Sequence, residues 1–393
     1  MADYIAFVNS DHDLQRCVRY YSDVEAIRVS LRRWKPQWSR AINTNIWIDP
    51  GLDGYDLILK GKRVFDEWKD YAKQFDSQCL LADTAFLKKP VREAVRTIVF
   101  KVLGDCLTKG PDWITVPLLP VAGDSSRNRV SRELSKASGQ WKSERRFQGK
   151  LILPLIFTRP DQLKGRTQWR KTLALIQKCY SDADASAIWV VDSELSDQKC
   201  SKAFATRFEA LVRFHEDLRE TLPRGAKVIA GPYWGMNLVL WARGLCDHPA
   251  VSMGTGYSYM ISGTFAPRRA KSHVALLPLR RWAIVSPELK SWLIEALSRL
   301  SPDDSARQPL LKLSQAIDAC MRTDEAARNQ VAGTYKEWLD KIQGIAPEGR
   351  MLSLYQDLSS AYVLGKQLPK LPPSEAPGRD AGKVAEQLML RCL

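Results

Sequence analysis

The sequence has 393 residues, of which 45% are hydrophobic and 26% are charged, and this composition excludes a collagen-like, a wholly disordered or a small disulfide-stapled chain. Lys and Arg number 59 against 44 acidic residues, and the net charge of +15 favours contact with polyanions such as nucleic acid. The longest apolar runs, such as that over 150–157, are far shorter than the roughly 20 residues that span a bilayer, so we expect no membrane segment. No cationic region precedes the first apolar run, which indicates a cytoplasmic protein.

The cysteines and histidines do not form a metal-binding pattern. No two of the eight cysteines lie within four positions of each other, and the four histidines are also scattered. We therefore expect reduced and mostly buried cysteines, no zinc site and no cofactor.

After the first apolar run, a repeated rhythm begins at about residue 41, in which a short apolar run, a polar or glycine-rich break and a long amphipathic stretch follow one another. This rhythm is typical of β/α units. The expected strands, eight in all, are 4–8, 45–48, 113–116, 151–157, 187–191, 227–230, 250–253 and 273–277.

Helical patterns long enough for crossovers separate these runs, at 63–75, 91–107, 127–147, 168–180, 202–222 and 238–245. Repeated crossovers require a parallel sheet, either an open doubly wound sheet or a closed (β/α)₈ barrel. No GxGxxG or GxxxxGK[ST] motif follows any run, so the nucleotide-binding open sheet loses its usual support. We predict a (β/α)₈ TIM barrel with an all-helical C-terminal extension.

The predicted domains are an N-terminal segment over 1–40, the barrel over 41–280, helices over 281–367, and a proline-rich linker with a terminal helix over 368–393. The first segment contains a cluster of basic and aromatic residues that suits either a nucleic-acid backbone with stacked bases or a solvated helix face packed through its tryptophans. The members of this cluster are Arg28, Arg32, Arg33, Trp34, Lys35 and Trp38.

Catalytic groups of such barrels project from the carboxyl ends of the strands, so the residues that follow each apolar run are the candidates. These residues are acids, small residues and aromatics: Asp49, Asp53, Asp192, Gly231, Tyr233, Tyr257 and Tyr259. A planar heterocyclic base would stack on the aromatics and pair with a carboxylate, while a second carboxylate would serve as acid, base or nucleophile. The structural alternatives are a turn at Asp49 before Pro50 and a helix N-cap at Asp192.

The order of segments resembles the tRNA-guanine transglycosylase family of (β/α)₈ barrels, which exchange guanine for a 7-deazaguanine base. The similar segments are Ile48-Asp49-Pro-Gly51-Leu-Asp53-Gly-Tyr55, the strand at 151–157, and the closing unit 227–247 with Arg243-Gly244 and Asp247. The resemblance implies that Asp49 is a working acid and that Asp247 lies near the place of the nucleophilic aspartate. It also implies a purine or 7-deazapurine as partner, with Arg159, Arg268 and Arg269 meeting phosphate.

This chain departs from the family at several positions, because Leu118-Leu119 replaces an Asp-Glu pair and the zinc-binding cysteines are missing. Divergent members are associated with DNA modification and with anti-phage operons such as CBASS. We therefore expect one of three functions: a transglycosylase-like enzyme using Asp49 with Asp192 or Asp247, a barrel that binds a base, nucleic acid or a base-modified protein without exchange, or an unrelated carboxylate enzyme of the hydrolase or lyase type. A homodimer is compatible with all three.

Overall fold

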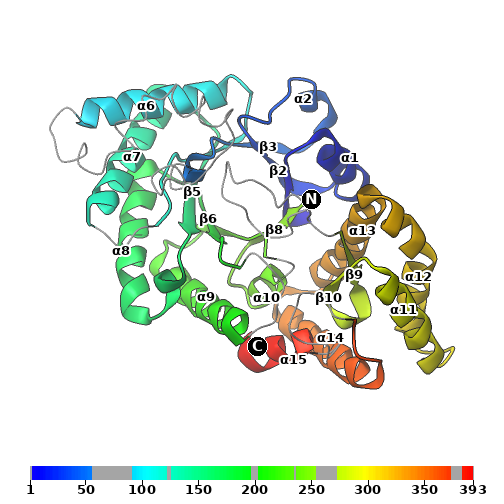
Figure 1. The fold of residues 1–393 in the computed structure, drawn as a ribbon. Helices are drawn as coiled ribbons and strands as arrows, with labels where there is room; N and C mark the ends of the chain where they lie inside the picture. The colour runs from blue at the N-terminus through cyan, green and yellow to red at the C-terminus, as the bar shows by residue number, and fades with distance from the viewer. Residues whose placement is uncertain are drawn as a thin grey trace.

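The computed structural model describes residues 2–54, 91–121, 125–195, 202–233, 236–253, 272–372 and 383–392. Eight parallel strands close into a barrel, in which each strand pairs with the next along the chain and the last pairs with the first (Figure 1). The strands are β1 Ala2–Val8, β2 Val24–Ser30, β3 Asn45–Asp49, β4 Trp113–Thr115, β5 Lys150–Phe157, β6 Ala187–Asp192, β7 Lys227–Ala230 and β8 His248–Ser252. The fold is the predicted (β/α)₈ barrel with a helical C-terminal region.

Helices cover the outside of the barrel (Figure 1). They are α1 Asp11–Tyr20, α2 Trp38–Ala41, α6 Val91–Leu107, α7 Ser125–Glu144, α8 Arg166–Ala183, α9 Lys202–Thr221 and α10 Asn237–Ala242. Short 3₁₀ turns lie at η1 Leu52–Gly54, η3 Pro160–Leu163 and η4 Leu277–Leu279. Of the predicted crossovers, only the one at 63–75 lies outside the described residues.

One strand of the barrel was not predicted, and one predicted barrel strand lies elsewhere. The second strand of the barrel is β2, inside the segment over 1–40, so the expected domain boundary at residue 41 is also wrong. The run at 273–277 forms β9 His273–Leu276, which pairs antiparallel with β10 Arg281–Ile284 outside the barrel. A four-residue apolar run fits either environment, and the pairing partner decides between them.

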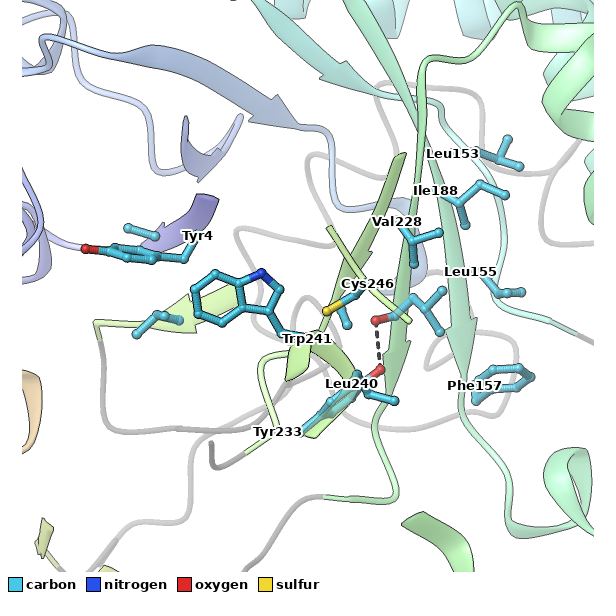
Figure 2. Close-up of a cluster of buried hydrophobic side chains, with 14 of the residues drawn as sticks. Tyr4, Leu153, Leu155, Phe157, Ile188, Val228, Tyr233, Leu240, Trp241 and Cys246 are labelled. Atoms are coloured by element: carbon cyan, nitrogen blue, oxygen red, sulfur yellow. Dashed lines mark hydrogen bonds between the residues drawn. The ribbon is translucent and has the colours of Figure 1, made fainter. Parts of the chain in front are cut away.

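The strands are buried on both faces, as parallel barrel strands require. Alternate side chains fill the barrel interior, among them Phe7, Ala26, Trp47, Trp189 and Ile229. The intervening side chains pack outward against the helices in a larger core. Figure 2 shows part of this outer core, with Leu153, Leu155 and Phe157 of β5 beside Ile188 and Val228 of the neighbouring strands.

The C-terminal region is helical as predicted, with α11 Pro287–Arg299, α12 Arg307–Arg322, α13 Asp324–Gln343, α14 Pro347–Gln367 and α15 Lys383–Cys392. The side chains of Ser286 and Thr323 accept hydrogen bonds from the first turns of α11 and α13 and so begin these helices. The proline-rich stretch 373–382 lies outside the described residues.

This region is not a separate domain. Val331, Tyr335, Trp338 and Leu339 of α13 belong to the same buried cluster as the barrel strands, and so do residues of α14 and α15. The helices α11 and α12 form a second small core with β9 and β10. The expected boundary at residue 280 therefore does not separate two cores, because α13 contacts α1 and α14 contacts α10 on the outside of the barrel.

Candidate functional site

Arg28 and Asp49 meet inside the barrel at the carboxyl ends of β2 and β3. In the register of these strands Arg28 pairs with Trp47 and Ser30 pairs with Asp49. Arg28 lies two positions after the interior residue Ala26, and Asp49 lies two positions after the interior residue Trp47, so both side chains point into the barrel. There the guanidinium of Arg28 forms an ion pair with Asp49 Oδ2. Arg28 is 5% and Asp49 3% exposed, so the pair is almost completely shielded from solvent.

Aromatic rings surround this ion pair. The Arg28 guanidinium carbon lies 4.8 Å from the ring centroid of Phe7 and 5.2 Å from that of Trp189. Trp189 packs edge-to-face against Trp47 with 5.3 Å between centroids. The indole N–H of Trp47 donates to Thr115 Oγ1 at 2.8 Å, and that of Trp189 donates to the carbonyl of Gly231 at 3.0 Å. These hydrogen bonds fix both rings. The arrangement combines a cation, a carboxylate and three aromatic rings at one end of the barrel.

Asp49 also shapes the turn after β3. Its Oδ1 accepts a hydrogen bond of 3.0 Å from the Gly51 N–H, and Gly51 has a φ of 70°, a conformation that favours glycine. The Asp49 carbonyl accepts a hydrogen bond from Leu31 N at 2.8 Å. The turn interpretation of Asp49 is therefore correct, and both carboxylate oxygens have partners.

Asp192 ends β6 but faces away from Asp49. Trp189 and Val191 point inward, so Asp192 points out towards α9, where Arg207 Nε and Nη2 donate to its two oxygens at 2.6 and 2.7 Å. The Asp192 side chain is fully buried, and burial raises its pKa although the hydrogen bonds and charge of Arg207 act in the opposite direction. Asp192 therefore joins a strand to a helix. It shares the carboxyl rim of the barrel with Asp49, as expected, but its side chain points outward whereas that of Asp49 points inward.

Asp247 lies at the opposite end of the barrel. It comes directly before β8, and its Oδ2 accepts hydrogen bonds from Val228 N at 2.8 Å and from Arg219 at 2.5 Å. Burial opposes its ionisation, but these bonds and the Arg219 charge outweigh burial and lower its pKa. We expected Asp247 near the working acids, and this placement is wrong because residue 247 precedes the strand rather than following it.

The expected base-binding residues are not brought together by the described part of the chain. Gly231 follows β7 with a φ of 89° and accepts the Trp189 N–H, so it borders the interior. Tyr233 is fully buried in the outer core, where its hydroxyl donates to the Val190 carbonyl at 2.7 Å (Figure 2) and burial raises its pKa. The structure therefore places Tyr233 in the outer core and not among the interior residues near Arg28 and Asp49. The backbone of Asp53 lies in η1, while Tyr257 and Tyr259 lie outside the described residues.

Of the expected phosphate-binding residues, Arg159 follows β5 and forms a 3.6 Å ion pair with Asp161, with 43% of its side chain exposed. Arg268 and Arg269 lie outside the described residues. The basic and aromatic cluster of the first segment does not form an open stacking surface, because Arg28 turns into the barrel and Trp38 is 2% exposed. The indole N–H of Trp38 donates to Asp11, and Lys35 pairs with the same carboxylate. The predicted packing is confirmed for Trp38, but the expected helix face is wrong because Arg28 lies on strand β2.

In the described ranges, no group of three or more His, Cys, Asp or Glu side chains lies close enough to hold a metal ion. The five cysteines whose side chains are described, Cys17, Cys106, Cys179, Cys246 and Cys320, are buried and free, as predicted. Burial raises their pKa values, in Cys17 to about 12. None of the described helices has the length and apolar character needed to cross a membrane.

Sequence comparison adds no family: no family model matches the chain, and no curated protein matches it. Among solved structures, the carboxyl transferase domain of Rhizobium etli pyruvate carboxylase with pyruvate is 12% identical, with a TM-score of 0.38, over 99% of this chain and 61% of that chain. The same domain with 3-hydroxypyruvate gives 12% identity and a TM-score of 0.37, over 99% of this chain and 60% of that chain. This chain thus spans about 60% of the length of these matches. The strand pairing defines the protein as a (β/α)₈ barrel, and the Arg28–Asp49 ion pair lies at the carboxyl ends of its strands.

Proposed function

We propose that the carboxyl end of the barrel binds a guanine-type purine or 7-deazapurine base without exchanging it. The observation that carries the proposal is the position of the Arg28–Asp49 pair among Phe7, Trp47 and Trp189. Arg28, Asp49, Phe7, Trp47 and Trp189 together form what we call the mouth cluster. Each of them is buried, which is the environment in which hydrogen bonds to a ligand discriminate most strongly.

The donor and acceptor groups of the mouth cluster match one edge of guanine. Guanine presents O6 as an acceptor and, next to it, N1–H and the 2-amino group as donors. Arginine pairs with the acceptor side of guanine, and a carboxylate pairs with adjacent N–H donors. Arg28 and Asp49 lie side by side and supply both halves, and the neighbouring aromatic rings suit a flat heterocycle.

Binding without exchange is favoured by the positions of the other acids. Replacing one base by another on a sugar needs a nucleophile and a proton donor or acceptor within reach of the same ring. Of the three acids predicted for this role, only Asp49 lies in the interior at this end. Asp192 is held outside by Arg207, and Asp247 lies at the other end. The proposed setting in anti-phage defence or DNA modification comes from the resemblance alone.

Calorimetric titration of the native protein tests the proposal without any substitution. Guanine, 7-cyano-7-deazaguanine and 7-aminomethyl-7-deazaguanine are compared with hypoxanthine, which lacks the 2-amino group, and with adenine. We expect micromolar binding of guanine, about 8 kcal/mol, and affinity for hypoxanthine at least about tenfold weaker. Absence of binding by all five bases, or equal affinity for all, would overturn the proposal.

An incorporation assay separates binding from exchange. The protein is incubated with radiolabelled guanine and either tRNA or duplex DNA, and label in the nucleic acid is counted. We expect guanine binding in the titration and no incorporation above a no-protein control. Incorporation would instead support the transglycosylase-like function, with Asp49 and a second acid from the residues that the structure does not describe.

A further inference from the structure

A cavity of about 340 Å³ lies between α12, α13 and the segment formed by β9 and η4. Its size is within the range of small-molecule sites in proteins. None of the mouth-cluster residues lines it, so it is separate from the proposed base site. The cavity lies outside the barrel, and Tyr20 of α1 is one of its lining residues.

The floor of the cavity is apolar and firmly packed. Leu276, Leu310 and Leu313 line it, and each is at most 3% exposed. The edge of β9 is held in place by Gln330, whose amide accepts from Ala275 N at 2.8 Å and donates to Ala275 O at 3.0 Å. This pair of hydrogen bonds ties α13 to the strand and fixes one wall of the cavity, so its shape is built into the fold.

The rim of the cavity carries two opposite charges on facing helices, Lys312 on α12 and Glu337 on α13. Within the described part of the chain neither has an ion-pair partner. Neighbouring charges on the same helices do have partners, since Lys290 pairs with Asp318 and Lys336 with Asp340, each within 2.8 Å. Asn329 adds an amide to the same rim.

We propose that this cavity binds a short apolar peptide through its two charged ends. The peptide ammonium pairs with Glu337, its carboxylate pairs with Lys312, and its side chains cover the leucine floor. A zwitterion with an apolar body satisfies both unpaired charges and buries apolar surface in one step, which neither an anion nor a purely apolar ligand does. The proposal is independent of base binding at the mouth cluster.

Calorimetry with the full-length protein and leucyl-leucine tests this site, with N-acetyl-leucyl-leucine amide as the probe that lacks both charges. We expect saturable binding of the free dipeptide and no measurable binding of the capped one. Glu337→Gln and Lys312→Gln should each weaken binding about three- to tenfold, because a partly exposed ion pair contributes on the order of 1 kcal/mol. The matched control Glu348→Gln, an exposed acid on α14, should bind as the native protein does.

Both charged positions are accessible, so the substitutions should not disturb folding, and a thermal unfolding curve for each variant checks this. Absence of leucyl-leucine binding by the native protein would overturn the proposal. Equal binding of the free and capped dipeptides would also overturn it, as would unchanged affinity in both rim variants. Each of these outcomes leaves the base-binding proposal unaffected, because that proposal is tested separately by titration with guanine.

Discussion

Arg28 and Asp49, 21 residues apart on adjacent strands, form a buried ion pair inside the barrel. Burying two charges costs several kcal/mol per ion, and their attraction offsets this cost only when each keeps its partner. Asp49 keeps a second partner in Gly51 N, and the Arg28 guanidinium lies close to the rings of Phe7 and Trp189. The pair therefore combines a structural role with the groups proposed to bind a base.

Removing one member of the pair should destabilise the protein more than removing both. We expect Asp49→Leu to lower the free energy of unfolding by about 3–5 kcal/mol, because Arg28 then stays buried without its carboxylate. The double variant Arg28→Met with Asp49→Leu should recover most of this loss. Urea unfolding of the native protein, both single variants and the double variant measures the coupling. Additive effects of the two substitutions would contradict the ion pair.

The helix α13 should behave as part of the barrel core. Leu339 is fully buried among barrel residues, and we expect Leu339→Ala to cost about 2–5 kcal/mol, the range for a buried leucine. Leu352 on α14 is 63% exposed, and Leu352→Ala should change the free energy of unfolding by less than about 0.5 kcal/mol. Denaturant unfolding measures both. A loss for Leu339→Ala as small as that of the control would mean that the C-terminal region is separate from the barrel.

His215 should make stability depend on pH. It is fully buried on α9, and burial lowers its pKa from 6.5 to about 3. The folded protein therefore resists protonation that the unfolded chain accepts, so the contribution of His215 is present above about pH 6.5 and is lost as pH falls towards 3. Between pH 7 and pH 5 this one group should remove about 2 kcal/mol.

The His215→Leu variant tests this assignment, because it keeps an apolar group at the position and removes the titration. Urea unfolding at pH 7 and pH 5 gives the pH dependence of native and variant proteins. The variant should lose about 2 kcal/mol less than the native protein over that interval. An identical pH dependence in both proteins would assign the loss to other groups.

The closed barrel could be predicted from the sequence because its units repeat one pattern, but single strands could not always be placed. The segment Val24–Ser30 contains Glu25 and Arg28, and Arg28 faces the barrel interior. Because these charges interrupt the apolar run, the sequence pattern does not indicate a barrel strand. The run His273–Leu276 has the composition of a barrel strand but pairs outside the barrel, and only the partner distinguishes the two cases.

The candidate site could be predicted only in part, for reasons of strand direction and side-chain alternation. Asp49 could be predicted as a site residue because it ends a strand. Its pairing with Arg28 could not be predicted, because it depends on the register of β2 and β3. Asp192 also ends a strand, yet it points outward because Trp189 and Val191 occupy the inward positions. The position of Asp247 was inferred from the resemblance alone, whereas the structure places it directly before β8, at the amino end of that strand.

Guanine binding by an Asp49→Asn variant tests the central claim most directly. Asn keeps the size of the side chain but replaces one acceptor oxygen by a donor, so it should oppose the N–H donors of guanine. Asp247→Asn is the matched control, because Asp247 is also held by an arginine but lies at the other end of the barrel. Thermal unfolding first defines a temperature at which all three proteins are folded. We expect affinity at least about tenfold weaker for Asp49→Asn and unchanged for Asp247→Asn. Equal guanine affinity in the folded Asp49→Asn variant and the native protein would contradict the account.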